Sequence, residues 1–292
     1  MHLTEPTFLH APDGIPLAVY DGPLAPGEPV RATVLIVHGM GEHAGRYAAL
    51  AQRLNGWGCA VRAYDQYGHG RSGGPRGGLS RDGRLLDDLA LVLDATRAGM
   101  PSGQPLVLLG HSMGGLVAAD FVASGVRQVD GLVLSSPALA LHLSGLQKAL
   151  LASLPKLLPN LRVSNGVDAR DLSHDAAVVQ AYDRDPLQHD RISARMARYM
   201  AEGGARVRAQ APAWKVPTLL LWAGQDKLVD PAGSADLARQ APQAVLQAQC
   251  FGQAFHEIFN ESEALAAPVL ARLRQWLVQQ WPQLQPLTPS GV

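Results

Sequence analysis

The chain has 292 residues, of which 47% are hydrophobic and 17% charged, so it holds enough apolar side chains for a sizeable core and is not a disordered protein. Its 25 basic and 25 acidic side chains balance, which excludes a strong field that attracts nucleic acid or an anionic bilayer. The N-terminus lacks a basic stretch followed by an apolar one, and no segment reaches the length of a membrane span. We therefore expect a cytoplasmic protein with no nucleic-acid partner.

Short apolar runs alternate with longer amphipathic ones, which predicts one α/β domain with helices on a mostly parallel sheet. The expected strands are, in chain order, Ala18–Tyr20 as an antiparallel edge, Thr33–Val37, Ala60–Tyr64, Leu106–Leu109, Leu132–Leu134, Thr218–Trp222 and Ala244–Ala248. The expected helices are Tyr47–Asn55, Arg81–Thr96, Gly115–Ala123, Ala232–Gln240 and Glu261–Gln280. Between residues 136 and 217 the alternation stops, and helical periodicity without a convincing strand predicts a helical insertion. Cys59 and Cys250 fall at apparent buried strands and are interpreted as core thiols, not as a disulfide or metal pair.

Ser112 stands in the segment Gly110-His111-Ser112-Met113-Gly114, between a predicted strand and a predicted helix. A serine on such a turn is typical of a nucleophile elbow, in which glycines prevent a collision between strand and helix. A second copy of the pattern surrounds Ser72, but it follows a polar loop and leads to Pro75, where a helix begins poorly. We predict Ser112 as a nucleophile and Ser72 as a loop residue.

A serine nucleophile needs a base within hydrogen-bond reach and an acid that orients this base. In the α/β-hydrolase arrangement the acid and then the histidine follow the serine along the chain. His256 comes after the last predicted strand and directly before the C-terminal helix, so it is the predicted base. Asp226 lies just beyond the strand Thr218–Trp222 and is the preferred acid. Asp230, which precedes a proline, is better interpreted as a helix N-cap and remains the alternative.

Two backbone N–H groups must stabilise the oxyanion of a tetrahedral intermediate. Met113 follows the nucleophile and is one predicted donor. Met40 is the other, because His38-Gly39-Met40-Gly41 forms a flexible loop after the strand Thr33–Val37. A plain tight turn is the alternative for this loop.

The other polar residues near these motifs are interpreted as structural. His38 and His111 are expected to pack beside the elbow, and the loop of residues 65–70 to form a turn beneath it. The Asp, His and Cys residues show no paired spacing of a zinc or iron site, and a dinucleotide fingerprint is missing. We expect neither a metal nor a cofactor.

Three motifs resemble the monoglyceride lipase and lysophospholipase branch of the α/β-hydrolases, a serine aminopeptidase S33-like group. They are the H-G-x-G-E-H-x-x-R-Y stretch of residues 38–47, Asp65 with residues 68–72, and residues 110–115. The likeness spans about residues 10 to 280. It implies an α/β-hydrolase core of residues 1–136 and 206–292 with a helical cap of residues 137–205. It also places Ser112, Asp226 and His256 on the family triad, and Met40 and Met113 on its oxyanion donors.

By the same resemblance, Glu42 and Arg46 help to build a polar pocket for a glycerol head group. A salt bridge that only braces the loop is the alternative. The chain departs from the animal monoglyceride lipases at Phe259, where those enzymes carry a histidine three residues after the catalytic one.

The expected cap contains a leucine-rich stripe with two lysines among its members. The stripe packs on the core of the cap, lines an apolar tunnel, or touches micelles or membranes. Its members are Leu143, Leu146, Leu150, Leu151, Leu154, Leu157 and Leu158, with Lys148 and Lys156.

These observations predict a serine carboxylic-ester hydrolase, a monoacylglycerol lipase or lysophospholipase that cleaves single-chain lipid esters through an acyl-enzyme. The same triad also serves thioesters, aryl esters and peptide amides, because fold and triad do not set the leaving group. A non-catalytic small-molecule binder is disfavoured by the intact Ser, Asp and His set. Dehalogenases and epoxide hydrolases of this fold carry Asp where Ser112 stands. The expected partners are a lipid or ester substrate and, through the cap, a transient membrane or micelle contact; the sequence leaves the oligomeric state open.

Overall fold

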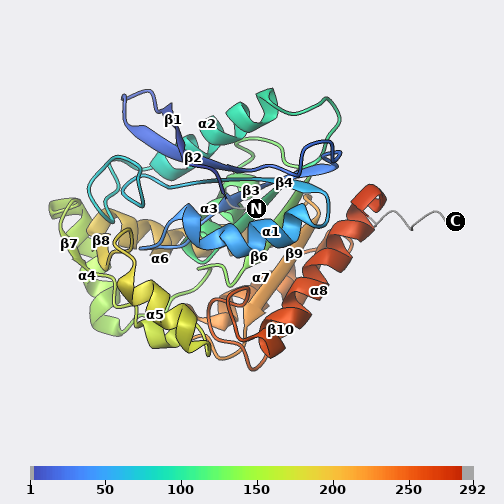
Figure 1. The fold of residues 1–292 in the computed structure, drawn as a ribbon. Coiled ribbons are helices and arrows are strands. Elements are labelled where there is room, and N and C mark those ends of the chain that lie inside the picture. The colour runs from blue at the N-terminus through green and yellow to red at the C-terminus, as the bar shows by residue number, and fades with distance from the viewer. Residues whose placement is uncertain (1–2, 285–292) are drawn as a thin grey trace, which may run out of the picture.

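A computed structural model describes residues 3–284 of the chain, except for the side chains of residues 146, 148–150, 152 and 156. Eight strands form one sheet in the spatial order β1-β2-β4-β3-β5-β6-β9-β10 (Figure 1). β2 runs antiparallel to β1 and to β4, and all the other pairs are parallel. The strands are β1 (Thr7–His10), β2 (Pro16–Gly22), β3 (Ala32–Val37), β4 (Cys59–Tyr64), β5 (Leu106–His111), β6 (Gly131–Ser135), β9 (Thr218–Ala223) and β10 (Leu246–Phe251).

Helices cover both faces of this sheet, so its central strands are apolar on both sides (Figure 1). Side chains of α1 and α8 join one buried cluster, and side chains of α2, α3 and α7 join the other. Successive residues of β3 alternate between the two clusters, with Leu35 in one and Ile36 in the other. The helices are α1 (Ala48–Asn55), α2 (Arg84–Ala98), α3 (Met113–Ala123), α7 (Pro231–Gln240) and α8 (Glu263–Gln280), with short 3-10 helices at Ala44–Tyr47, Ala169–Asp171, Ala211–Ala213 and Pro282–Leu284.

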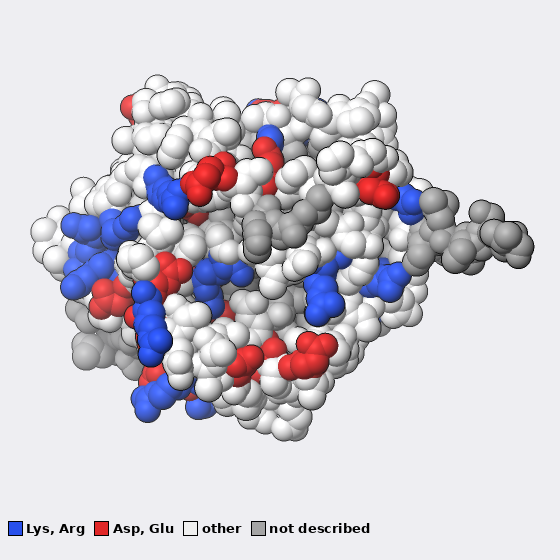
Figure 2. Space-filling view, in the orientation of Figure 1, with Lys and Arg blue, Asp and Glu red and all other residues white. Residues whose placement is uncertain are grey.

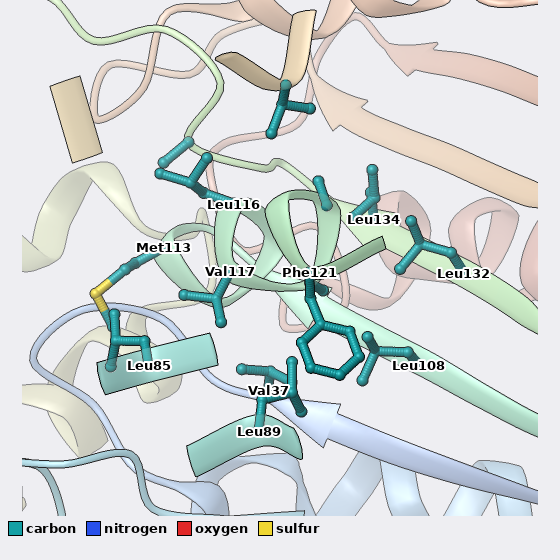
Figure 3. Close-up of a cluster of buried hydrophobic side chains, with 14 of the residues drawn as sticks. Val37, Leu85, Leu89, Leu108, Met113, Leu116, Val117, Phe121, Leu132 and Leu134 are labelled. Carbon is teal, nitrogen blue, oxygen red and sulfur yellow. The ribbon is translucent and has the colours of Figure 1, made fainter. Parts of the chain in front are cut away.

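Helix α3 is held to the sheet by fully buried side chains. Figure 3 shows Val117 and Phe121 of this helix in one cluster with Leu89 of α2, Val37 of β3 and Leu108 of β5. Full burial of one such side chain contributes about 1.5–3 kcal/mol relative to leaving it exposed. The start of α3, which directly follows the predicted nucleophile, is therefore firmly placed against β5.

The chain between β6 and β9 forms further elements, of which α4, α5, β7 and β8 lie at one side of the molecule while side chains of α6 join the buried cluster that contains α3 (Figure 1). Two three-residue strands form an antiparallel ribbon among its helices, so the expectation of an insertion without strands was incomplete. Strands this short show no measurable hydrophobic period, and all three side chains of the first one are exposed. The elements are α4 (Gly145–Leu157), β7 (Arg162–Ser164), α5 (Ala176–Arg184), β8 (Arg191–Ser193) and α6 (Ala194–Ala209).

The predicted central strands are confirmed to within two residues, and the larger differences are at the sheet edges. Residues 18–20 lie in β2 and are antiparallel as predicted, but β1 pairs on their outer side and forms the edge. β10 begins at Leu246 and continues to Phe251, so it includes Cys250. The thiol of Cys59 is buried as predicted, whereas Cys250 is exposed because alternate residues of an edge strand face solvent.

The parallel strands β3, β5, β9 and β10 all end at the same edge of the sheet, so the loops that follow them gather there. These loops carry the predicted oxyanion donor, nucleophile, acid and base. No helix within residues 3–284 combines the length and apolarity that a membrane span requires.

Candidate active site

Ser112 sits at a sharp turn between β5 and α3, with φ 53° and ψ −121°. A positive φ is a strained conformation for a residue other than glycine. The neighbouring glycines are required by close backbone contacts: a Cβ at Gly114 would lie 2.2 Å from the carbonyl oxygen of Val37, and one at Gly110 would lie 2.4 Å from that of Gly114. The local structure therefore has the geometry of the predicted nucleophile elbow.

Asp226 and His256 come from the loops after β9 and β10 and form a buried pair. The distance between His256 Nδ1 and Asp226 Oδ2 is 2.6 Å, and both side chains are almost fully buried. The backbone N–H groups of Leu228 and Val229 donate to the other carboxylate oxygen of Asp226 at 2.9 and 3.0 Å. Asp230, the alternative acid, is instead the N-cap of α7, as its position before a proline predicted.

The two partners perturb one another's pKa values in opposite directions. Burial alone would raise the pKa of Asp226, but the charge of His256 and the hydrogen bonds to Oδ1 and Oδ2 lower it overall. Burial alone would lower the pKa of His256, but the nearby carboxylate of Asp226 raises it overall. The pair is thus built to stabilise an imidazolium at His256 while Asp226 stays ionised.

Ser112 and His256 both line a cavity of about 400 Å³. Within the described residues no hydrogen bond joins the Ser112 hydroxyl to His256; such bonds are often long without substrate and tighten in the complex. The chemistry available to a serine, a buried histidine and an orienting aspartate in one cavity is nucleophilic acyl transfer.

The loop after β3 lies against the nucleophile. A Cβ at Gly39 would stand 3.1 Å from the Cβ of Ser112, so a larger residue there would push the loop away. The amides of Met40 and Met113 take part in no hydrogen bond to other described residues. Met113 directly follows Ser112, and Met40 lines the same cavity as Ser112, so their N–H groups stay the predicted donors to an oxyanion.

The histidines beside the elbow have the contacts of structural residues. His38 Nδ1 donates to the carbonyl of Gly39 at 2.7 Å, and its Nε2 accepts from the backbone N–H of Gln66 at 2.9 Å. Burial lowers the pKa of His38, so both contacts suit the neutral ring. Burial and the positive charge of His256 lower the pKa of His111 to about 4, and its ring centroid lies 4.8 Å from that of His256.

Ser72 does not approach the cavity, in agreement with its interpretation as a loop residue. Its hydroxyl accepts from the backbone N–H of Ala18 at 2.8 Å and donates to the carbonyl of Asp65. The Asp65 carboxylate accepts from the hydroxyl of Tyr20 and the backbone N–H of Ala44, both at 2.8 Å. This loop ties neighbouring segments together below the site.

The predicted pair of Glu42 and Arg46 is extended by Glu257, a carboxylate that the sequence analysis did not single out. Arg46 Nη1 donates to Glu42 Oε2 at 2.7 Å and also to Glu257 Oε1, while Nη2 donates to Glu257 Oε2 at 2.7 Å. The three side chains are at most 10% exposed, and all three line the cavity. The only sequence signal for Glu257 is its place directly after His256, because its partner lies 211 positions away.

The leucine-rich stripe is divided between the cavity and the surface. Leu143, Leu151 and Leu154 line the cavity, whereas Leu157 and Leu158 are 77% and 54% exposed. The predicted members Leu146, Leu150, Lys148 and Lys156 have side chains outside the described part of the structure. Further apolar side chains line the cavity from neighbouring elements: Leu141, Leu161, Val163, Ile192 and Met200.

The parallel sheet, the elbow and the His256–Asp226 pair define an α/β-hydrolase of the serine type. The family model described as serine aminopeptidase, S33 (Hydrolase_4) matches residues 28–263, and the chain belongs to this family. The expected resemblance and fold class are thereby confirmed.

Curated relatives and solved structures cover most of the chain. It is 34% identical to a monoacylglycerol lipase of Mycolicibacterium smegmatis over 252 residues. This alignment covers 85% of this chain and 88% of that protein. It is 32% identical over 237 residues to phospholipase YtpA of Bacillus subtilis, covering 80% of this chain and 90% of that protein. The crystal structure of the Paleococcus ferrophilus monoacylglycerol lipase matches with a TM-score of 0.79 at 34% identity, covering 91% of this chain and 99% of that one.

Proposed function

We propose that the protein is a serine carboxylic-ester hydrolase that cleaves single-chain lipid esters, a monoacylglycerol lipase or lysophospholipase. The observation that carries this proposal is the shared cavity: Ser112 and His256 line it together with many apolar side chains and with the polar cluster of Glu42, Arg46 and Glu257. An apolar acyl chain fits the apolar side chains, and a hydroxylated leaving group fits the polar cluster. The names of the relatives, monoacylglycerol lipase and phospholipase, support the same substrate class.

In the proposed mechanism, the Ser112 hydroxyl oxygen attacks the ester carbonyl carbon while His256 Nε2 accepts its proton. The backbone N–H groups of Met40 and Met113 stabilise the oxyanion. His256 then donates the proton to the leaving alcohol, and an acyl-enzyme remains on Ser112. Water, deprotonated by His256, attacks the acyl carbonyl and releases the fatty acid. Asp226 keeps the Nδ1–H tautomer of His256 and stabilises its imidazolium form.

Residues 137–205 are proposed as a cap that delivers substrate from micelles or membranes. Leu161 and Val163 support this role because they line the cavity and are still 44% and 49% exposed. In Figure 2 both signs of charge are interspersed, with Lys and Arg gathered at the left edge over β7 and β8. Exposed apolar side chains beside basic ones suit an interfacial contact. A cytoplasmic location is proposed as well, supported by two cysteines that are both unpaired.

Labelling with a fluorophosphonate probe and hydrolysis of 1-decanoylglycerol test the function together. The wild-type protein should be labelled and should hydrolyse the ester, while Ser112→Ala should lose labelling and keep less than about a hundredth of kcat. Ser72→Ala is the matched control, because this serine stands in the same sequence pattern but off the cavity. Equal behaviour of the two variants contradicts the assignment of the nucleophile. Binding of the lipid without labelling or turnover would instead support a non-catalytic binder.

A further inference from the structure

The guanidinium group of Arg46 is occupied by the protein's own carboxylates. Three of its donor contacts go to Glu42 and Glu257, and the side-chain amide oxygen of Gln188 accepts from Nε at 3.2 Å. A guanidinium has five N–H donors in a fixed planar fork. The fork is therefore engaged already, and a phosphate could bind it bidentately only by displacing Glu257.

The cluster of Glu42, Arg46 and Glu257 carries one unbalanced negative charge. Burial disfavours ionisation of Glu42, yet the charge of Arg46 and the hydrogen bond from the Tyr47 hydroxyl lower the pKa of Glu42 to about 2, so it is ionised at neutral pH. Glu257 accepts two hydrogen bonds from the guanidinium of Arg46 and is the second carboxylate of the cluster. Of the other lining residues, His111 is neutral, with its pKa lowered to about 4 by burial and by His256. Asp226 adds a further carboxylate behind His256.

This charge lies in the same cavity as Ser112 and His256. A Cβ built on Gly39 would lie 2.9 Å from Glu42 Oε1 and 3.1 Å from the Cβ of Ser112. Glu42 and Ser112 therefore both approach Gly39, and Glu42 is close to the predicted nucleophile. Glu257 directly follows His256, the residue that returns the proton to the alcohol. More than half of the remaining lining residues are leucine, valine, isoleucine or methionine, which suits the acyl chain.

We infer that Glu257, together with Glu42, is a specificity-determining residue that excludes anionic head groups and selects esters of neutral alcohols. This inference rests on the proposed ester hydrolysis and narrows it: within single-chain lipids, a glycerol ester is accepted and its phosphorylated counterpart is rejected. A phosphomonoester carries close to two negative charges at neutral pH. In a buried site these charges are repelled by the carboxylates and also lose their hydration.

The test compares 1-decanoylglycerol with 1-decanoylglycerol 3-phosphate, both below their micelle concentrations. For the wild-type protein, kcat/KM should favour the neutral ester by at least about thirtyfold, the size expected for like charges some 7 Å apart at an intermediate dielectric. Glu257→Gln should reduce this ratio by about tenfold because one of the repelling charges is removed. Asp171→Asn is the matched control, since this carboxylate pairs with Lys227 outside the cavity wall, and it should leave the ratio unchanged.

Binding of the same two lipids to Ser112→Ala by titration calorimetry gives a readout that needs no turnover. If neither lipid is hydrolysed but the affinity ratio follows the expected pattern, the proposed function fails and the charge selection stands. Equal affinities for the two lipids, or a ratio that Glu257→Gln leaves unchanged, overturn the inference. Should Glu257→Gln not fold, Glu42→Gln removes the other carboxylate of the cluster and must shift the ratio in the same direction.

Discussion

The acid of the proposed triad can be tested at a single residue because the chain offers two aspartates in one loop. Asp226→Asn should lower kcat by roughly a thousandfold or more, since an amide neither fixes the productive tautomer of His256 nor stabilises its imidazolium. Steady-state kinetics with 1-decanoylglycerol measures this loss. Asp230→Asn is the control and should keep most of the activity, because asparagine also caps a helix well. The opposite ranking of the two variants would move the acid to Asp230.

The protonation state of His256 sets the expected pH dependence. Attack by Ser112 needs the neutral imidazole, and the Asp226 carboxylate, against the effect of burial, raises the pKa of His256 above 6.5. The value of kcat/KM should therefore fall as the pH decreases through a midpoint above 6.5, and rise to a plateau on the alkaline side. The measurement is a pH profile of kcat/KM with a substrate that does not itself ionise. An acid limb with its midpoint well below 6.5 would show that the Asp226 pair does not govern the reaction.

At the scale of elements, the cap segment presents apolar side chains at the end of α4. Leu157 and Leu158 are exposed, and we predict that they enter a lipid interface. Replacing both with serine should reduce the hydrolysis of vesicle-bound monoacylglycerol by about tenfold, since each leucine contributes at most about 1.5–3 kcal/mol on full burial. Hydrolysis of monomeric p-nitrophenyl butyrate provides the control and should be unchanged. Equal loss on both substrates indicates damage to the fold of the cap and not to an interface.

The elements that the sequence predicted best are those whose pattern is local. The apolar runs of β3 and β5 and the glycines around Ser112 follow from burial and from a turn within a few residues. The ribbon of β7 and β8 was missed because each strand has only three residues and gains its stability from pairing. The position of Cys250 was misjudged because exposure in β10 depends on its being the edge strand, which the order of strands decides.

At the scale of the whole molecule, the pairing of Asp226 with His256 was predictable because chain order and strand ends constrain it. Asp226 and His256 each follow a recognisable strand, so their 30-residue separation was no obstacle. The contact of Arg46 with Glu257 joins residues 211 positions apart, and no local pattern distinguishes this glutamate from a solvated one. Such a cluster is created by the closure of two loops at one sheet edge, which becomes visible only with the fold.

The overall shape of the site also limits which lipids can react. One cavity of about 400 Å³ is lined by Ser112 and, among other residues, by leucines of the chain between β6 and β9. Each additional buried methylene contributes up to about 0.8 kcal/mol of binding, or nearly fourfold in affinity. For monoacylglycerols, kcat/KM should therefore rise from acetyl toward medium or long chains, until the length of the cavity or the solubility of the substrate limits it.

Triacylglycerols have to place three chains around a covered site, so tributyrin and triolein should be poor substrates, and a peptide amide should be poorer still. Rates for this panel, measured beside a series of monoacylglycerols of increasing length, separate the possibilities. Fastest turnover of acetyl esters, or efficient cleavage of the amide, would rule out the single-chain lipid as substrate and would leave Ser112, Asp226 and His256 as the machinery of a different acyl transfer. Preference for a medium-chain monoacylglycerol over its triacylglycerol is the expected outcome, because only one chain fits the apolar wall while the neutral alcohol lies at the carboxylate cluster.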